Sequence, residues 1–211
     1  MPRPTGLSAS VPRTTVPWSL AATDDLESLW LPAPLYLESI EAGEEWRYDA
    51  DTLDIHSASN DVNTQGIDYS LTAIEPELAP APLSRAGRAQ FELATRYTRL
   101  PNNLPGIVED LAAEVTKGRP SDFHRAVALQ NWFQREFTYS TDTAPGNGND
   151  ELEEFLSEDG RTGYCEQFAS AMAVMARSLD IPARVAVGFL EAATVARFGG
   201  VDVWINNAGI S

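Results

Sequence analysis

Cys165, the one cysteine in this 211-residue sequence, stands where a loop gives way to a segment with the apolar spacing of an amphipathic helix. A thiol at a helix start lies beside backbone N–H groups that have no partner within the helix, and at the positive end of the helix dipole. Both stabilise a thiolate, and the N–H groups can later hold an oxyanion. This arrangement is typical of a cysteine nucleophile, although Glu166 next to it has the opposite effect. The simpler alternative is a buried small hydrophobic residue, as many single cysteines are.

A cysteine nucleophile needs a base, and the two histidines of the sequence, His56 and His124, both precede Cys165. An unassisted thiol has a pKa of about 8.5, whereas a histidine partner can lower it to roughly 3 to 4. His124 falls near the start of a predicted helix, and His56 on or just after a predicted strand. A solvated or capping imidazole is the simpler interpretation of each. Either could act as the base only within about 3 to 4 Å of Cys165.

Composition excludes several classes of function. Asp and Glu number 31 against 15 Lys and Arg, a formal charge of -16 that repels nucleic acid and anionic membrane surfaces. One cysteine and two histidines cannot form an intramolecular disulfide or a structural zinc site, so we expect no metal and no cofactor. The longest mainly apolar stretch, residues 168–176, is about half of a membrane span, and residues 1–30 contain no apolar run of an export signal. Taken alone, these features predict a cytoplasmic protein by default.

The first part of the chain favours strands. Residues 1–28 are rich in Pro, Ser, Thr and Ala without periodicity, and we expect a flexible lead-in there. Residues 29–76 predict a small antiparallel β region with one buried face, because short apolar segments alternate with turn residues. Its clearest strand carries Ile67, Tyr69, Leu71 and Ala73 in alternation. Residues 76–82 are punctuated by proline and predict a linker.

Helical spacing dominates after the linker. We predict helices near residues 84–97, 105–115, 121–137, 150–157 and 165–179. Ser121 is the expected N-cap of the third, and Asp180, Ile181 and Pro182 end the last. Val185, Val187 and Phe189 alternate over a predicted strand at 183–190. The pattern predicts an α+β fold, with the small antiparallel β region followed by a helical domain that has Cys165 at the N-terminus of a core helix.

Residues 163–172, GYCEQFASAM, and the following 177–184, RSLDIPAR, resemble the nucleophile helix of bacterial transglutaminase-like proteins, members of the papain-like superfamily of cysteine acyltransferases and peptidases. Supporting matches are residues 129–133, LQNWF, before 137–140, FTYS, and 146–150, GNGND, before 152–156, LEEFL. The resemblance extends from about residue 30 to 190. It places the transglutaminase-like domain, in its Cys-bearing N-terminal half, at residues 77–190.

The resemblance implies that Cys165 attacks a glutamine or peptide carbonyl and forms a thioester. In that family a histidine on a following strand is the base, and an aspartate on the next strand orients it. No histidine follows Cys165 in this sequence, so the resemblance implies a papain-like domain that is incomplete after the cysteine strand. Family domains of this type are usually extracytoplasmic and membrane-tethered, but this sequence shows neither signal nor tether, which leaves the compartment unknown.

The last segment has a different character. Residues 193–211, and within them Asn206-Asn207-Ala208-Gly209, resemble the fourth-strand region of short-chain dehydrogenases. Dehydrogenase activity is not expected, because the chain has no glycine fingerprint for a dinucleotide and its single lysine, Lys117, is preceded four residues earlier by Ala113. A gene fusion or an error of the gene sequence would explain a tail at 191–211, and chance similarity is the alternative.

Two functional hypotheses follow. The first is transglutaminase-like acyl transfer or amide hydrolysis on protein or peptide substrates through a thioester at Cys165, impaired by the missing histidine and aspartate. The second is a catalytically inactive remnant or an interaction module. Missing strands would also leave an exposed sheet edge, through which we expect self-association.

Overall fold

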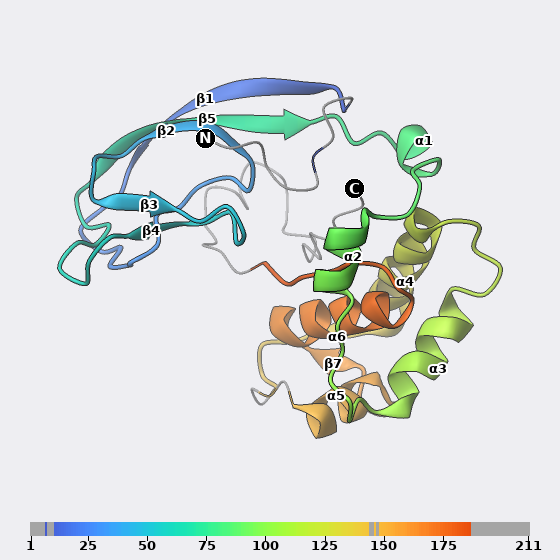
Figure 1. Ribbon diagram of the computed structural model, residues 1–211. Coiled ribbons are helices and arrows are strands. Elements are labelled where there is room, and N and C mark those ends of the chain that lie inside the picture. The colour runs from blue at the N-terminus through green and yellow to red at the C-terminus, as the bar shows by residue number, and fades with distance from the viewer. Residues whose placement is uncertain (1–6, 8–10, 144–145, 147, 187–211) are drawn as a thin grey trace. The chain divides into compact units, whose positions relative to one another are not determined.

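The computed structural model describes residue 7 and residues 11–143, 146 and 148–186. The chain divides into two compact units, Met1–Leu78 and Ala79–Ser211 (Figure 1). The first unit consists of strands and the second mainly of helices, and each has its own hydrophobic core. The α+β fold predicted from the sequence is confirmed.

The first unit is built on a three-stranded antiparallel sheet in the order β1-β5-β2. The strands are β1 (Arg13–Ala21), β2 (Leu37–Glu41) and β5 (Asp68–Pro76). The predicted alternation is present in the central strand, since Tyr69, Leu71 and Ala73 are at most 5% exposed while their neighbours are not buried. These three side chains form one face of the core.

The expectation of a flexible lead-in at 1–28 is wrong for its second half. Residues 13–21 form β1, which pairs along its whole length with β5, from Arg13 opposite Pro76 to Ala21 opposite Asp68. No residue of β1 is buried, and Pro17 stands within its short alternation of Val16, Trp18 and Leu20, so the segment resembles the Pro- and Ser-rich stretch around it. Its edge position also explains why Pro17 is tolerated within it.

Buried Thr64 ties the end of the predicted lead-in to the sheet unit. Its hydroxyl accepts a hydrogen bond from the Ser28 N–H (3.1 Å) and donates one to the Leu26 carbonyl (2.6 Å). The remainder of the unit is a short hairpin of β3 (Trp46–Tyr48) and β4 (Ile55–Ser57). Trp46 and Ile55 from this hairpin join the core of the sheet.

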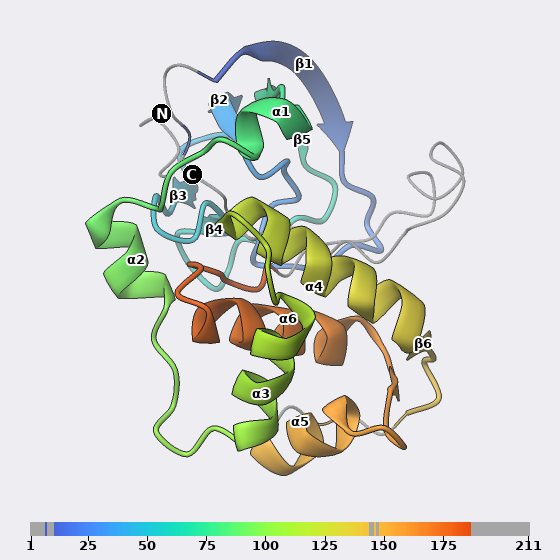
Figure 2. The ribbon, with the colours of Figure 1, turned by 90° about the vertical axis from the view of Figure 1, so that its right-hand side faces the viewer.

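The second unit consists of six helices and one short parallel pair of strands among the described residues. The helices are α1 (Pro80–Leu83), α2 (Phe91–Tyr97), α3 (Gly106–Val115), α4 (Asp122–Glu136), α5 (Asn149–Leu156) and α6 (Cys165–Ser178). The strands are β6 (Thr138–Tyr139) and β7 (Thr162–Gly163). Helix α6 packs against α3, α4 and α5 (Figure 2).

The predicted helices of this unit are present, with two differences at the boundaries. Part of the predicted linker forms α1, and the weak helix expected at 84–97 is limited to α2. Neither α1 nor α2 has a buried residue, so no apolar face marks their ends. The strand expected at 183–190 is not formed over residues 183–186, while residues 187–190 and the tail at 191–211 lie outside the described residues.

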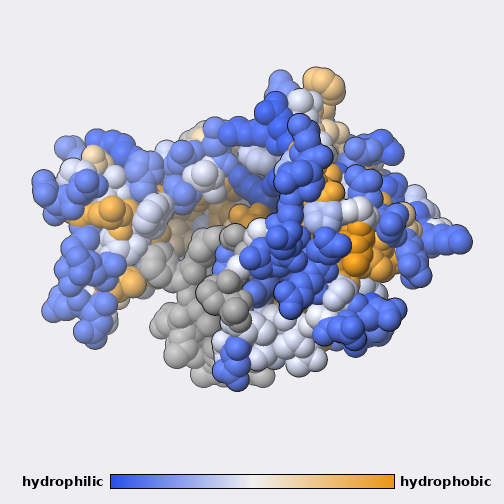
Figure 3. All heavy atoms as spheres, turned by 90° about the horizontal axis from the view of Figure 1, so that it is seen from below, coloured by the Kyte–Doolittle hydropathy of each residue, from blue (hydrophilic) through white to orange (hydrophobic). Residues whose placement is uncertain are grey.

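One face of the molecule shows how polar and apolar residues are distributed. Hydrophilic residues cover most of the face seen in Figure 3, with small areas of hydrophobic residues between them. No helix in the described part of the chain has the length and apolar character to cross a membrane. The same residues contain no cluster of three or more His, Cys, Asp or Glu side chains suited to a metal ion.

Candidate active site

Cys165 is the first residue of α6, and its side chain is exposed. The residue before it, Tyr164, is extended, with φ -114° and ψ -175°, and serves as the N-cap. Its N–H donates a hydrogen bond to Oε1 of Gln167, 2.9 Å away, as in half of a capping box. The thiol therefore stands at a well-defined helix start, where first-turn N–H groups have no partner within the helix.

The β6–β7 pair fixes the backbone that leads into this helix. The strands are parallel, with Tyr139 opposite Gly163. The Thr138 N–H donates to the Arg161 carbonyl (2.8 Å), and the Ser140 N–H donates to the Gly163 carbonyl (2.7 Å). Two residues before Cys165, the chain is thus hydrogen-bonded to the segment that follows α4.

Gly163 has no room for a side chain. A Cβ atom at this position would lie 2.8 Å from Cε2 of Phe155 and 3.2 Å from Oε1 of Gln167. The second atom is the acceptor that caps Tyr164. Gly163 therefore permits both the close approach of α5 and the cap of α6.

A cluster of aromatic rings holds the first half of α6. Phe168, one turn after Cys165, has its ring centroid 5.2 Å from that of Phe155, 5.9 Å from Phe137 and 6.0 Å from Phe133. All four phenylalanines are at most 9% exposed. Half-exposed Tyr139 adds a ring 6.3 Å from Phe168. These contacts join α4, α5 and β6 to the turn that carries the thiol.

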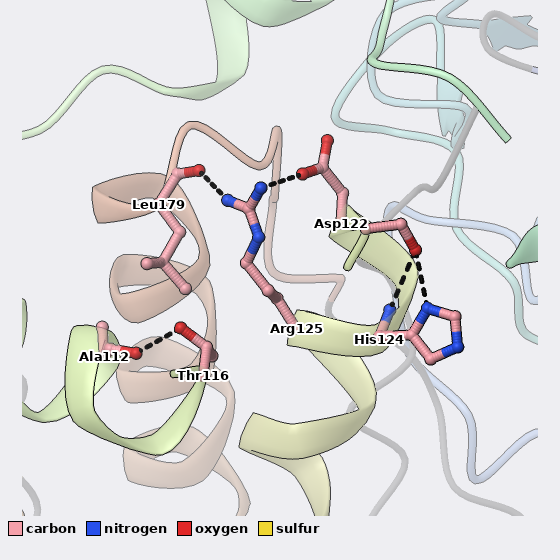
Figure 4. Close-up of polar contacts among 7 residues, drawn as sticks. Ala112, Thr116, Asp122, His124, Arg125 and Leu179 are labelled. Carbon is pink, nitrogen blue, oxygen red and sulfur yellow. Dashed lines mark hydrogen bonds and ion pairs between the residues drawn. The ribbon is translucent and has the colours of Figure 1, made fainter. Parts of the chain in front are cut away.

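The C-terminal end of α6 is held by different groups. Nη1 of Arg125 donates to the Leu179 carbonyl at 3.3 Å, and its Nη2 lies 3.2 Å from Oδ1 of Asp122 (Figure 4). Asp180 has a positive φ of 62°. The Ile181 N–H reaches back to the Ala176 carbonyl at 3.0 Å, which closes a Schellman turn at the predicted helix end.

Arg177 connects this end to its surroundings. Its Nε donates to the Ala183 carbonyl (2.7 Å) and its Nη1 to the Arg99 carbonyl (3.2 Å). Burial lowers the pKa of Arg177 from its ordinary value. The guanidinium nevertheless stays charged, because arginine does not lose its proton in proteins. The Ala183 N–H also donates to the Tyr97 carbonyl (3.1 Å), so the segment after α6 is attached to the end of α2 and to the loop that follows it.

The structure does not bring His124 to the thiol. Arg125 contacts the end of α6, whereas Phe133 and Phe137 contact Phe168 near its start, so α4 and α6 are antiparallel. His124 is therefore separated from Cys165 by nearly the length of the 14-residue α6, about 20 Å at 1.5 Å per residue.

Each histidine instead has a local partner. Nδ1 of His124 lies 2.8 Å from Oγ of Ser121, the N-cap predicted for α4, and the ring points away from Leu179 (Figure 4). His56 belongs to β4 of the first unit, with Nδ1 3.7 Å from Oδ1 of Asp54. These contacts agree with the simpler interpretation of both imidazoles.

Sequence reasoning missed two features of the thiol's surroundings. One is the cap by Gln167, because a capping box is usually recognised by Ser or Thr at the N-cap, and here that residue is tyrosine. The other is a hydrogen bond of 2.6 Å from the Tyr164 hydroxyl to Oε2 of Glu166. A tyrosine and a glutamate two residues apart across a helix start carry no recognised sequence signal.

Comparison with known proteins finds a family whose model matches the part of the chain that contains this site. Residues 109–209 match the model of the family described as the Transglutaminase-like superfamily. The Bacillus subtilis protein named "Uncharacterized protein YebA" is 36% identical over 108 residues, 50% of this chain and 14% of YebA. A Pseudomonas aeruginosa "Protein-glutamine gamma-glutamyltransferase" is 41% identical over 64 residues, 30% of this chain and 9% of that enzyme. The chain thus spans a small part of either relative.

Solved structures agree on the fold. The periplasmic domain of TgpA from Pseudomonas aeruginosa has a TM-score of 0.56 at 21% identity, with 92% of this chain and 65% of that domain covered. Its ethylmercury-bound form has a TM-score of 0.54 at 22% identity, with 87% and 62% covered. The family match extends across the segment expected to resemble a dehydrogenase, which the described residues do not include. Residues 109–209, which include α6 with Cys165, are therefore similar to the transglutaminase-like superfamily.

Proposed function

We propose that Cys165 is the nucleophile for acyl transfer from, or hydrolysis of, the side-chain amide of glutamine or a peptide carbonyl. The observation that carries this proposal is an exposed cysteine at the capped start of α6, inside the region matched by the family model. The name of the Pseudomonas relative, a glutamine gamma-glutamyltransferase, supports the same chemistry.

The reaction has two steps. The Cys165 thiolate attacks the carbonyl carbon, a C–S bond forms, the C–N bond breaks, and the nitrogen takes up a proton and leaves as ammonia or an amine. The N–H groups of the first turn of α6 are suited to hold the oxyanion that forms in between. A primary amine or water then attacks the thioester carbon: a C–N or C–O bond forms, the attacking group loses a proton to solvent, and the C–S bond breaks with its electron pair on sulfur.

We further propose that this chain alone performs the reaction slowly. His124 lies at the other end of the α4–α6 pair, and no histidine follows Cys165 in the sequence. Without a base, the thiolate fraction stays small and the departing nitrogen lacks a proton donor, losses that typically cost factors of about 10⁴ or more. The position of His124 also favours the second candidate, a catalytically inactive domain that serves in protein interaction.

Release of ammonia from a glutaminyl dipeptide, with and without excess imidazole, separates the two candidates. We expect slow release that increases severalfold with imidazole, because the added base replaces the missing one. The Cys165→Ala variant should lose this release, and the matched His124→Ala variant should keep it. Equal release by the parent chain and Cys165→Ala, with imidazole present, would instead establish the non-catalytic candidate.

A further inference from the structure

Strand β1 forms one edge of the sheet in the first unit, and no described segment pairs with its outer side (Figure 1). The opposite edge strand, β2, has features by which proteins limit further pairing, because it is five residues long, its register shifts after Leu37 and two of its residues are glutamates. Strand β1 is nine residues long, pairs regularly along its whole length and has one charged residue, Arg13. Of the two edges, β1 is the one suited to accept another strand.

Backbone hydrogen bonds fix which groups of β1 face outward. In an antiparallel pair, facing residues alternate between those bonded to each other and those that are not. The Glu77 N–H donates to the Pro12 carbonyl (2.8 Å), so this pair is bonded. The Ile74 N–H, opposite Thr15, donates instead to the Tyr36 carbonyl (2.9 Å), on the far side of β5. The even-numbered residues of β1 are therefore bonded to β5, and the N–H and C=O groups of the odd-numbered ones point away from it.

The outward groups of β1 form an incomplete row. Its odd-numbered residues, all exposed, offer five carbonyls but four N–H groups, because Pro17 has none. An extended chain from a different protein would lose one hydrogen bond opposite Pro17. Two β1 strands paired with each other would lose two, since each brings its own proline. Pro17 therefore favours a different chain over a second copy as the partner of this edge.

A partly exposed tryptophan lies on the same edge. Trp18 is opposite buried Leu71 of β5, so its side chain lies on the core face of the sheet, with those of Val16 and Leu20. Leu20 packs against the core, whereas Trp18 is 43% exposed. An aromatic side chain pairs favourably with a β-branched residue on a neighbouring strand. A strand added beside β1 would place such a residue next to Trp18.

Negative charge surrounds the ends of β1 but not its middle. Residues 1–78 contain 14 Asp and Glu and three Arg, without a lysine. Five exposed acidic residues lie in or just beyond the ends of β5, or shortly after β1: Glu75, Glu77, Asp68, Asp24 and Asp25. Between Thr14 and Ala21 the strand itself is uncharged. The edge therefore complements a segment that is apolar at its centre and basic at its ends, whereas a second acidic copy would be repelled.

We propose that β1 is a docking edge, to which an extended basic segment of another protein adds as a further strand. The backbone of that segment binds the outward N–H and C=O groups of β1, its apolar side chains cover Trp18, and its Lys or Arg side chains lie near the acidic residues at the ends. The partner is a polypeptide, because a ladder of alternating donors and acceptors is matched by another backbone. This inference goes beyond the acyl-transfer proposal and does not depend on Cys165.

A synthetic peptide tests the docking edge on the whole 211-residue chain. The probe is acetyl-Lys-Thr-Val-Thr-Val-Thr-Val-Thr-Lys-amide, whose valines match the face of Trp18. Amide hydrogen exchange, followed by NMR, should be fast at Thr15 and Ser19 in the free chain and slow at Val16 and Trp18, which are bonded to β5. Millimolar peptide should slow exchange at Thr15 and Ser19 by about tenfold or more, and molar salt should weaken binding.

Matched peptides separate strand addition from simple charge attraction. With the valines on the Trp18 side, the threonine N–H groups of the peptide point toward β1 and the valine N–H groups point away. N-methylation of the threonines should therefore abolish the slowed exchange, whereas N-methylation of the valines should leave it. Replacing both lysines by glutamates should weaken binding severalfold.

Variants of β1 test the same geometry from the protein side. Ser19→Pro removes an outward N–H without breaking a bond to β5, so it should lower affinity by about tenfold or more while the β5 amides keep their protection. Pro17→Thr restores the missing donor and should raise affinity about twofold to tenfold. Trp18→Ala should lower affinity severalfold, and the matched Trp30→Ala, which removes a 53% exposed tryptophan outside β1, should leave it unchanged.

Three results would contradict this assignment. Unchanged exchange at Thr15 and Ser19 with millimolar peptide, or equal slowing by the threonine-methylated peptide, overturns the docking edge. Slowing at these amides that depends on the concentration of the chain itself would mean that a second copy occupies the edge, which overturns the basic partner. An unchanged affinity in Ser19→Pro contradicts the outward direction of its N–H. None of these measurements involves ammonia release, so their failure is distinct from failure of the acyl-transfer test.

Discussion

The two units of this chain are each stabilised internally in a different way. In the first unit, the nine-residue strand β1 has no fully buried side chain and is held mainly by its backbone pairing with β5. In the second unit, α4, α5 and α6 are joined by a cluster of buried phenylalanine rings. Backbone pairing can be made by almost any sequence, whereas ring packing demands particular residues at particular spacings. The helical unit is therefore the one whose sequence reveals its structure, and it holds Cys165, the nucleophile proposed above, in place.

Removing one ring from the aromatic cluster should have the largest effect on stability, and it should destabilise the helical unit without destabilising the sheet unit. Phe133 is 1% exposed, and its ring centroid lies within 6.4 Å of the rings of Trp132, Phe137, Phe155 and Phe168. Phe133→Ala should cost about 3–5 kcal/mol of unfolding free energy. Hydrogen exchange should show lost protection in α3, α4 and α6.

The same exchange experiment tests the difference between the units. Amides of β5 should keep their protection in Phe133→Ala, because the sheet has its own core. Phe91→Ala is the control, since Phe91 is 84% exposed and its loss should change stability by less than about 0.5 kcal/mol. Equal loss of protection in β5 would mean that the two units unfold as one.

A methyl group at Gly163 should have an intermediate effect, localised at the thiol. Gly163→Ala places a Cβ 2.8 Å from Phe155 and 3.2 Å from the capping oxygen of Gln167, so we expect a loss of about 1–3 kcal/mol in chemical denaturation. Gly106→Ala, at the first residue of α3, meets no atom within 4 Å and should be neutral or slightly stabilising. Equal stability of the two variants would show that α5 moves away from the added methyl group without a loss of unfolding free energy.

The smallest effect concerns the sheet unit and depends on pH. The Tyr69 hydroxyl donates to the Pro32 carbonyl at 2.6 Å, and burial raises the pKa of Tyr69 from 10.0 to about 12. Tyr69→Phe should lose about 1 kcal/mol at neutral pH, because the hydrogen bond is lost. Since the folded pKa is the higher one, the neutral hydroxyl's contribution is complete below pH 10.0 and is lost as pH rises toward 12.

Denaturation of the parent and Tyr69→Phe across this alkaline range checks the sign. The parent should lose stability between pH 10.0 and 12 more steeply than the variant, and the two curves should converge. Tyr139→Phe is the matched control, because Tyr139 is half exposed. Parallel curves for Tyr69→Phe and the parent would contradict the assignment.

The sequence predicted the helical unit well because its signals are local. Ser121 caps α4 as expected, and Phe168, Met172 and Ala176 lie on the buried side of α6. Strand β1 escaped prediction because Pro17 stands within its short alternation of Val16, Trp18 and Leu20, in a segment rich in Pro, Ser and Thr. The surroundings of Cys165 were predicted in part: its helix position is read from spacing, whereas the close approach behind Gly163 and the Tyr164–Glu166 bond depend on how segments meet in space.

The antiparallel pairing of α4 and α6 bears on how such a domain can change during evolution. The rings around Phe168, the β6–β7 pair and the Arg125 and Arg177 contacts that position α6 all come from residues 97–183. The orientation of the thiol is therefore encoded separately from any base or substrate surface supplied by later residues. A domain arranged in this way can change the residues that act together with Cys165 and still keep the thiol in place.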